Sequence, residues 1–552
     1  MPTPVRFQAA TTVAEMNKQL PFSDSSRLRQ RAQQHLRAGQ WSEAQAALES
    51  LLRLAPHDTE ACIDLAEVML RQDQLRASCR PLLQALQRLP TDAPLIVRLV
   101  QHLLARGEVL AARACLDFLA QAPHPPPELL VAQAQLRFST GEIAMAKALM
   151  DKAMHAGADS PGDHHLHAML LQFSGKIDQA CDVLEKCLRR WPQFGDAAMV
   201  LVNLRKQTPG SNRLDFVREQ LRHLPQDSQN QGDIFVRAEF EYALFKILDD
   251  LGRHDEAWPA LARCNALMHE INPYDGDGGT AVVEALTGTP DVIGNVGRAS
   301  RLKFDGPIPI FIVGLPRSGT TLLDRMLSSH SEVTSAGEII DFWRQMHWAA
   351  DVAPARTASL LKIIQRSPDI DFVEVGARYL EQTQWRAQGR RYYIDKLPGN
   401  IQMVAFIRRA LPHAPILHMV REPMDTCFSN FKAMFGNTSP YSYDLQALGR
   451  HYGQYATVAN HWRTHIPDAM LDVSYASLVR DPETTMRRVI AHCGLDMEES
   501  CLRPELNAAP VATPSNAQVR ESIHTRGVDQ WRHYASYLEP LRQALAAQGL
   551  LG

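Results

Sequence analysis

Residues 308–338 read IPIFIVGLPRSGTTLLDRMLSSHSEVTSAGE, and they decide the fold of the second half of the chain. Residues 308–313 form a short apolar run rich in β-branched side chains, which predicts a buried parallel strand. A turn follows over 314–319, and the apolar positions of 320–327 then recur with helical spacing. Strand, glycine turn and helix together predict an anion cradle, because backbone N–H groups and the positive end of the helix dipole converge there.

The spacing of this turn is similar to that of the nucleotide-binding P-loop, in which a lysine and a hydroxyl residue follow the second glycine. Gly314 and Gly319 are separated by four residues, and Thr321 stands at the hydroxyl position. Thr320 replaces the lysine, which argues against ordinary ATP or GTP hydrolysis, and Arg317 is the nearest cation. A plain glycine-rich turn of an α/β domain is the alternative interpretation.

Residues 28–205 repeat with a period of 34 residues. Two columns of the repeat are the turn residues Gly39, Asp73, Gly107, Gly141 and Gly175, and the small residues Ala44, Ser78, Ala112, Ala146 and Ala180. Such a period, with a glycine-like turn and a small residue where two helices touch, is the tetratricopeptide signature. It predicts an all-α solenoid that binds a peptide or protein, with a structural spacer or oligomerisation arm as the alternative.

Residues 206–300 are expected to hold one further helical repeat and a connector. The pattern recovers over 239–267, which predicts another helix pair. Residues 272–279, NPYDGDGG, are expected to form a loop; they lack the spaced acidic ligands of a calcium-binding loop.

Residues 305–552 change to an α/β pattern. Further strands are predicted over 391–395, 414–420 and 470–474, with helical patterns between them, so we expect a mostly parallel sheet. Polar groups at the C-terminal ends of such strands meet at one edge of the sheet. Lys396 follows one predicted strand and Arg421 another, and Ser429 lies two turns into the next predicted helix. Arg421 could alternatively pair with its neighbour Glu422 or with Asp425.

The composition excludes several classes of protein. A formal net charge of −3 and a pI near 6.7 give no reason to expect a nucleic-acid partner. Nine cysteines without paired spacing favour reduced thiols over a disulfide framework or a zinc site. No signal peptide and no run of about 18 apolar residues is present, so we expect no membrane association and a cytoplasmic location.

The ordered set of PRSGTT after a strand, Lys396, and Arg421 followed by Ser429 resembles the sulfotransferases that use 3′-phosphoadenosine 5′-phosphosulfate (PAPS). Within them, residues from about 305 to 535 look most like the tyrosylprotein sulfotransferases, and like bacterial proteins that join such a domain to tetratricopeptide repeats. The resemblance implies a P-loop-like α/β sulfotransferase domain after the solenoid.

The resemblance also implies residue roles. The 5′-phosphosulfate would be held by Arg317, Ser318, Gly319, Thr320 and Thr321, the 3′-phosphate by Arg421 and Ser429, and the nucleotide would contact Tyr475. Glu338 matches the catalytic base, while Lys396 and Ser515 match residues that stabilise the transferred sulfuryl group. The segment 515–524 matches a loop that folds over the cofactor.

Two family cations are absent, since Ala433 and Gln530 stand in their places. Lys432, Arg520 and Arg526 are the candidates to compensate. For Glu338 the alternative is a carboxylate at a helix start, favoured by the dipole. His330 is an alternative base, although we expect it to pack or to cap its helix.

The sequence therefore predicts a metal-independent, PAPS-dependent sulfotransferase whose acceptor is a protein or peptide tyrosine, held by the solenoid. A carboxylate base suits a phenol, whose pKa is near about 10. The alternatives are a glycan, lipid or small phenol as acceptor, or a tetratricopeptide scaffold with a non-catalytic nucleotide-binding domain. The sequence is compatible with a homodimer.

Overall fold

The computed structural model describes residues 22–289, 292, 294, 306–512 and 520–551. Two compact units make up the chain, divided between Thr91 and Asp92. The first unit contains α1 (Phe22–Arg37), α2 (Trp41–Leu54), α3 (Thr59–Arg71) and α4 (Leu75–Ala85). The second unit begins with eleven helices: α5 (Ala93–Ala105), α6 (Val109–Leu119), α7 (Pro127–Ser139), α8 (Ile143–His155), α9 (Pro161–Phe173), α10 (Ile177–Arg190), α11 (Gly195–Leu204), α12 (Leu214–His223), α13 (Gln231–Asp250), α14 (His254–Ile271) and α15 (Gly276–Gly288).

The helix pairs confirm the predicted repeat. Every member of the turn column has a positive φ, from 61° at Asp73 to 84° at Gly141, so each turn uses the left-handed conformation that glycine adopts most easily. Every member of the small-residue column is fully buried between its helices. Helices α13 and α14 form the further pair expected over 239–267. All nine cysteines are buried thiols, as expected.

The small-residue column makes a stability prediction. Ala146 on α8 has no exposed surface, whereas its neighbour Met145 is 44% exposed. We expect Ala146→Leu to lower the free energy of unfolding by about 1–3 kcal/mol, because the larger side chain overpacks the contact between helices. Met145→Leu is the matched control and should change the free energy of unfolding by less than about 0.5 kcal/mol in a urea titration. Equal stability of the two variants would contradict the assigned packing.

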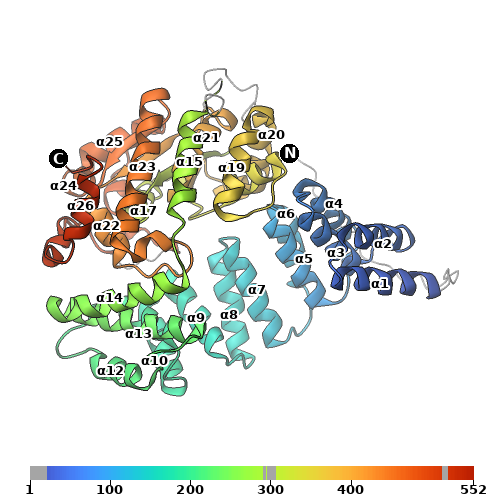
Figure 1. Ribbon diagram of the computed structural model, residues 1–552, viewed down its shortest axis with the longest axis horizontal. Helices are drawn as coiled ribbons and strands as arrows, with labels where there is room; N and C mark the ends of the chain where they lie inside the picture. Colours follow the sequence, from blue (N-terminus) through green and yellow to red (C-terminus); the bar gives the residue numbers. More distant parts are fainter. Residues whose placement is uncertain (1–21, 290–291, 293, 295–305, 513–519, 552) are drawn as a thin grey trace. The chain divides into compact units, whose positions relative to one another are not determined.

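The predicted loop over 272–279 is wrong in its second half. Helix α15 begins at Gly276, where the side chain of Asp275 accepts a hydrogen bond from the Gly278 N–H at 2.8 Å. This N-cap satisfies one of the amide groups that a helix start leaves unpaired. Helix α15 lies between α19 (Arg356–Arg366) and α23 (Leu445–His465) and packs against both of them (Figure 1).

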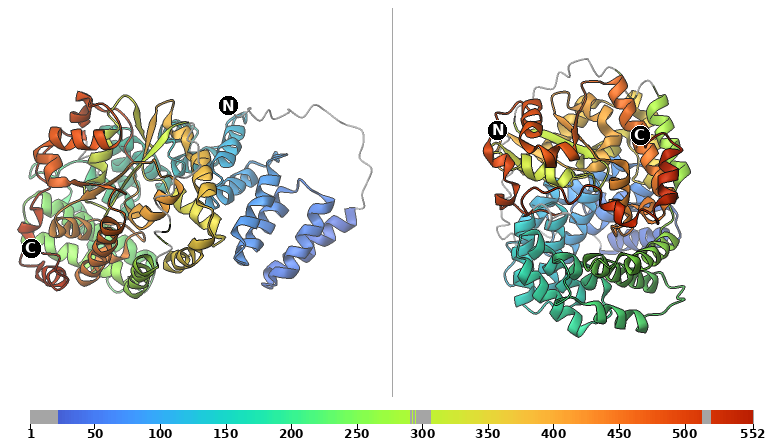
Figure 2. Two further views of the ribbon diagram at one scale, coloured as in Figure 1. Left: turned by 90° about the horizontal axis from the view of Figure 1, so that it is seen from above. Right: turned by 90° about the vertical axis from the view of Figure 1, so that its left-hand side faces the viewer.

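The α/β part contains one five-stranded sheet, visible as arrows in both views of Figure 2. Its strands are all parallel and lie in the order β2-β3-β1-β4-β5. The bounds are β1 Ile308–Gly314, β2 Val333–Ser335, β3 Tyr392–Asp395, β4 Ile416–Val420 and β5 Leu471–Ser474. Four of these strands match the predicted ones to within two residues, and β2 was not predicted.

Helices connect the strands and cover the sheet. The remaining ones are α17 (Thr320–Leu327), α18 (Asp341–Ala350), α20 (Phe372–Thr383), α21 (Val404–Ala410), α22 (Pro423–Phe431), α24 (Tyr475–Arg480), α25 (Pro482–His492) and α26 (Glu539–Ala546). The core residues of β1 alternate between two apolar clusters, with Phe311 and Val313 in one and Ile310 and Ile312 in the other. Because successive side chains of a strand point to opposite faces, the sheet is packed on both sides.

Within the second unit, the turns of three successive helix pairs contact the α/β part. Gln345 donates to the Gly107 carbonyl at 3.3 Å, Arg386 to the Thr140 carbonyl at 3.2 Å, and Arg520 to the Phe173 carbonyl at 2.9 Å. These contacts recur because the repeat places equivalent turns along one edge of the solenoid.

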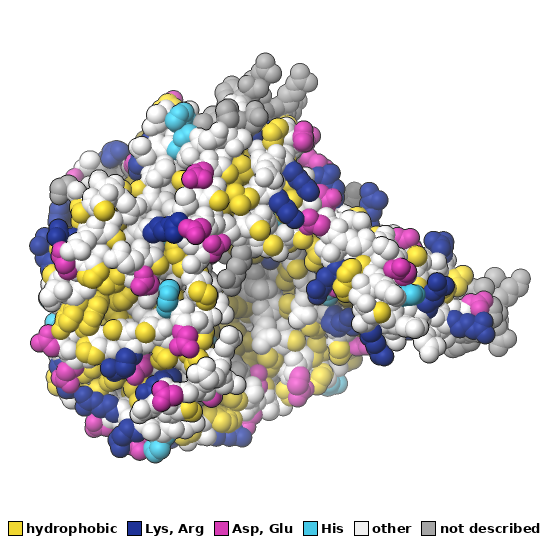
Figure 3. Space-filling model, viewed as in Figure 1, with side chains coloured by type: hydrophobic (Ala, Val, Ile, Leu, Met, Phe, Trp, Pro, Cys, Tyr) yellow, Lys and Arg dark blue, Asp and Glu magenta, His cyan; other side chains and the backbone are white. Residues whose placement is uncertain are grey.

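The face shown in Figure 3 carries Lys and Arg interspersed with Asp and Glu. Among the described residues, no helix is both long enough and apolar enough to cross a membrane.

Candidate active site

Five of the predicted site residues lie at the C-terminal ends of the five parallel strands. Arg317 belongs to the turn after β1, Glu338 follows β2, and Lys396 follows β3 directly. Arg421 comes immediately after β4 and Tyr475 immediately after β5. Since all five strands run in the same direction, their carboxyl ends meet at one edge of the sheet, and five residues far apart in the sequence are brought together there.

The turn after β1 has a strained and tightly packed backbone. Arg317 adopts a φ of 65°, which is uncommon for a residue with a side chain. Gly319 has a φ of 111°, and a Cβ added there would lie 2.5 Å from Cδ2 of Tyr475. Glycine is therefore required at this position, directly before the first turn of α17.

This turn opens into a cavity, which we call the first cavity. It is lined by Arg317, Gly319, Thr320, Thr321, Leu322, Arg421, Ser429, Lys432, Tyr475, Glu521, Ser522, Ile523, His524, Gly527 and Gln530. Seven of the eight residues predicted to bind the cofactor are among them. The exception is Ser318, whose buried hydroxyl donates to the Leu315 carbonyl at 2.8 Å and so stabilises the turn. Ser515 lies outside the described residues.

Arg421 faces this cavity from a buried position. Its Nη1 donates to the Arg317 carbonyl at 2.9 Å, its Nη2 donates to the Gly527 carbonyl, and its guanidinium lies 4.8 Å from the centre of the Tyr475 ring. Burial lowers the pKa of Arg421. Asp425 approaches it only to 3.9 Å. An anion in the cavity would therefore meet an arginine held in place largely by carbonyl groups and an aromatic ring.

Of the two partners considered for Arg421 in the alternative interpretation, Asp425 forms a long ion pair with it, whereas the ion pairs of the described residues do not include one with Glu422. The Glu422 carboxylate instead accepts a hydrogen bond from the Asp425 N–H at 2.7 Å. It thereby caps the N-terminus of α22, which suits a carboxylate because of the helix dipole.

Lys432 supplies a third cation to the first cavity. Its Nζ donates to Gln530 Oε1 at 2.8 Å, so it lies beside one of the two positions where a family cation is missing. The other candidates lie elsewhere: Arg520 is bonded to the Phe173 carbonyl, and the exposed Arg526 pairs with Glu521. Of the three candidates, only Lys432 lines the cavity.

Burial, with Arg317 and Arg421 nearby, lowers the pKa of Lys432 to about 8. The ammonium group is therefore mostly protonated near about pH 7 and mostly neutral near about pH 9.5. We expect the affinity for adenosine 3′,5′-bisphosphate to fall as the pH rises through this range, by about tenfold. Calorimetric titration of the wild type and of Lys432→Gln tests this. The variant should bind more weakly at the lower pH and show a flatter pH profile; parallel profiles would contradict the assignment.

Glu338 and Lys396 form an ion pair at the same edge of the sheet. The Lys396 N–H donates to the Gly337 carbonyl at 3.0 Å, which continues the β2–β3 ladder and brings the two side chains together. Lys396 is completely buried, whereas the Glu338 side chain is 43% exposed. The pair therefore joins a fixed buried cation to a carboxylate that an incoming molecule can reach.

The charges of Glu338 and Lys396 influence the pKa values of groups next to the first cavity. Burial lowers the pKa of Arg317, and Glu338 is among the groups that oppose this shift. Burial raises the pKa of Asp324 on α17 to about 6, and Lys396 is the main group that opposes it. Glu338 and Lys396 thus act electrostatically on the turn and helix that line the cavity.

His330 is packed, as expected. Its Nε2 is 2.9 Å from the Asp496 carbonyl, and its Nδ1 accepts a hydrogen bond from the Glu332 N–H at 3.0 Å. Both ring nitrogens are used within the fold, and the side chain is buried. These contacts leave Glu338 as the accessible base candidate.

A parallel sheet with a glycine turn and a helix start after its central strand, and cations at the neighbouring strand ends, defines an α/β protein of the P-loop-like class. Residues 309–499 match the family model described as the sulfotransferase family, and residues 35–78 match that of the tetratricopeptide repeat. The chain therefore contains a tetratricopeptide region followed by a sulfotransferase domain.

Several known proteins are similar to this chain. An uncharacterised protein of Aquifex aeolicus is 29% identical over 56% of this chain and 41% of its own length. The protein-tyrosine sulfotransferase of Drosophila melanogaster is 26% identical over 40% of this chain and 46% of its own. The chain thus spans less than half the length of these relatives. The sulfotransferase domain of the Synechococcus olefin synthase is 22% identical over 45% of this chain and 97% of its own, with a TM-score of 0.32.

Proposed function

We propose that the protein transfers the sulfuryl group of PAPS to a hydroxyl group, and that the acceptor is a tyrosine of a protein or peptide. The cations of the first cavity carry this proposal. Arg317, Arg421 and Lys432 come from three different segments and face one space, together with the start of α17. Three cations and a helix start favour a ligand with several separated negative charges, as PAPS has.

The residues present fit the two ends of PAPS. Arg317, Gly319, Thr320 and Thr321 would hold the 5′-phosphosulfate at the start of α17, while Arg421, Ser429 and Lys432 would hold the 3′-phosphate. Tyr475 offers a ring against which the nucleotide can lie. Lys432 takes the place of the cations missing at Ala433 and Gln530.

PAPS would supply an activated sulfuryl group and a good leaving group. Glu338 would accept the proton of the acceptor hydroxyl as its oxygen bonds to sulfur. The bond between that sulfur and the bridging phosphate oxygen breaks at the same time, and adenosine 3′,5′-bisphosphate leaves with the electron pair. Lys396, fixed and buried, would stabilise the charge that develops on the oxygens. The sequence resemblance assigns a similar role to Ser515.

The tyrosine acceptor is supported by the similarity to the protein-tyrosine sulfotransferase of Drosophila melanogaster and by the solenoid. Tetratricopeptide repeats commonly bind peptides and protein segments. In this chain the repeat turns touch the catalytic domain, so a polypeptide bound to the solenoid would be held near the site.

Transfer of label from radioactive PAPS to tyrosine-containing peptides tests the function. We expect sulfated tyrosine from the wild-type protein without added metal. Matched peptides with phenylalanine in place of tyrosine should remain unlabelled. Binding of adenosine 3′,5′-bisphosphate without transfer to any acceptor would instead indicate a scaffold with a non-catalytic nucleotide site. Absence of both binding and transfer would exclude both functions.

A further inference from the structure

The turn that bears the first cavity also lines a second one, with a volume of about 630 Å³. Arg317 and Gly319 face the first cavity, whereas Gly314, Leu315 and Pro316 face the second. A single short loop therefore separates the two spaces. A molecule bound in the second cavity would therefore lie next to PAPS bound in the first cavity.

The second cavity also adjoins the segments that carry Glu338 and Lys396. Trp343, five residues after Glu338, lines it from α18, and Gly399, three residues after Lys396, lines it from the 3₁₀ helix Pro398–Met403. The Trp343 indole donates to Asn400 at 3.0 Å and so ties the two segments together. The wall of the cavity is thus built on the elements that position the ion pair.

The two cavities differ in the charge of their described lining residues, since the first is lined by three cations. Among the described side chains that line the second cavity there is no lysine or arginine, and the one carboxylate, Asp275, is the exposed N-cap of α15. Burial lowers the pKa of His451 to about 4, and its ring stacks on Tyr441 at 3.6 Å. Burial also lowers the pKa of His347, whose Nδ1 lies 2.9 Å from the Val352 carbonyl. Both histidines are therefore neutral near about pH 7.

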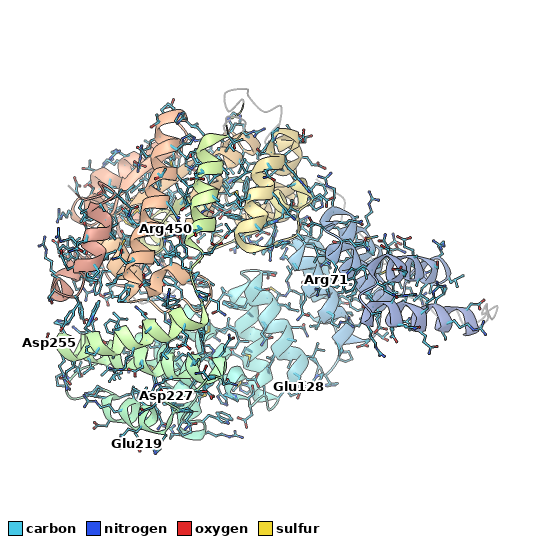
Figure 4. All side chains as sticks on the ribbon, in the orientation of Figure 1. Arg71, Glu128, Glu219, Asp227, Asp255 and Arg450 are labelled. Atoms are coloured by element: carbon cyan, nitrogen blue, oxygen red, sulfur yellow. The ribbon has the colours of Figure 1, made fainter. Side chains whose placement is uncertain are left out.

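Aromatic and aliphatic side chains form much of the remaining wall. Tyr274, Trp343, Tyr441 and Tyr455 contribute rings, and α15 contributes Val282 and Val283. Helix α15 is held against α23 by Arg450, which is labelled in Figure 4. Its guanidinium donates to Asp277 at 2.7 Å and to Thr280 at 2.9 Å. Such a wall favours a ring or an aliphatic group and gives no compensation for a charge removed from water.

We infer that the second cavity binds the acceptor, and that this acceptor is a phenol on an uncharged, largely apolar frame. The inference rests on the proposed function and narrows it: a tyrosine with neutral neighbours is preferred over a tyrosine among acidic residues. A carboxylate in the cavity would lose its hydration, and the described side chains of the wall offer it no lysine or arginine. The volume also exceeds that of one phenol ring, so neighbouring groups of the acceptor enter with it.

Two measurements test this inference. The first is calorimetric binding of N-acetyltyrosine amide, a neutral phenol, to protein saturated with adenosine 3′,5′-bisphosphate. The second is kcat/KM for label transfer from PAPS to a free neutral phenol, a tyrosine peptide with apolar neighbours, and the same peptide with glutamate neighbours. We expect the neutral phenol to bind, and the apolar peptide to exceed the acidic one by at least about tenfold. Comparison of the free phenol with the apolar peptide shows whether a polypeptide frame is required.

Substitutions in the wall of the second cavity test whether the phenol binds there. Val283→Trp fills the cavity from α15 and should lower both binding of the neutral phenol and kcat/KM by about tenfold or more. Glu284→Trp, at the exposed neighbouring position, is the matched control. Thr357→Arg adds a cation to the wall and should shift the preference towards the acidic peptide. Binding of adenosine 3′,5′-bisphosphate should be unchanged in all three variants.

Preference for the acidic peptide, or an unchanged Val283→Trp variant, would overturn the inference while leaving the proposed function intact. If the wild-type protein does not bind adenosine 3′,5′-bisphosphate, the proposed function is wrong. If the neutral phenol binds to the wild type but not to Val283→Trp, the cavity is the phenol site even when no transfer occurs. If the wild type does not bind it, the inference fails.

Discussion

Replacing Glu338 with glutamine is expected to lower kcat for sulfuryl transfer by about 100- to 10,000-fold, because the general base is lost. Glutamine keeps the length of the side chain and an oxygen that can accept a hydrogen bond from Lys396, so the buried ammonium group keeps a partner. The affinity for adenosine 3′,5′-bisphosphate should change by no more than about threefold, since Glu338 does not line the first cavity and acts on Arg317 only through its charge. Initial rates with radioactive PAPS, together with a calorimetric titration, give both quantities.

Glu332→Gln is the matched control for this variant. The Glu332 side chain is 45% exposed, close to the value for Glu338, and lies 4.0 Å from Arg391. Its replacement should leave kcat unchanged. A Glu338→Gln protein that transfers sulfate at the wild-type rate would show that another group accepts the proton.

Replacing Lys396 with methionine is expected to lower kcat by about 100- to 1,000-fold, an effect comparable to the loss of one fixed donor from an oxyanion hole. The side chain is completely buried, so its charge acts in a site with little water and cannot be replaced by a mobile cation. Methionine has a similar length, and the partner left behind, Glu338, is half exposed and can be hydrated. We therefore expect the fold to survive.

Urea titration distinguishes this catalytic effect from simple unfolding. The free energy of unfolding of Lys396→Met should stay within about 1–2 kcal/mol of the wild type, because the half-exposed Glu338 can be hydrated and no unpaired buried charge remains. Lys186→Met, at an exposed position on α10, is the control for kcat. Wild-type kcat in Lys396→Met would exclude a role for the ammonium group.

Each strand that was predicted from the sequence lies in a stretch of five or more residues that contains at least three apolar side chains. Strand β2 was missed because it has only three residues, Val333–Ser335, and one of these is apolar. Its position at the edge of the sheet is nevertheless what brings Glu338 beside Lys396. The ion pair therefore depends on an element too short for a periodic pattern to reveal.

Part of the first cavity was predictable, because the motifs that carry the family resemblance include Arg317, Arg421 and Tyr475, which follow the ends of β1, β4 and β5. The choice of Lys432 over Arg520 and Arg526 was not, since it depends on which neighbours each cation meets after folding. The second cavity gave no local signal. Its wall combines the start of α15, the turn after β1 and residues of α18 and α23, and only the tertiary structure joins them.

The contacts between repeat turns and the catalytic domain were also hidden in the sequence. Gly107 and Gly141 were predicted as turn residues, but a period of 34 says nothing about what the turns touch. In the structure a Cβ at Gly107 would lie 3.0 Å from the Cβ of Arg344 on α18. This glycine therefore serves both the turn and its close approach to the helix that follows Glu338.

The central claim, that the first cavity binds PAPS through a distinct 3′-phosphate site, is tested most directly by one calorimetric comparison. Adenosine 3′,5′-bisphosphate and 5′-AMP are titrated into the wild type and into Arg421→Ala. We predict that the variant loses about 10- to 100-fold in affinity for the bisphosphate, as expected for a charge-assisted contact, and much less for 5′-AMP. Equal losses for the two nucleotides would contradict the assignment of Arg421 to the 3′-phosphate.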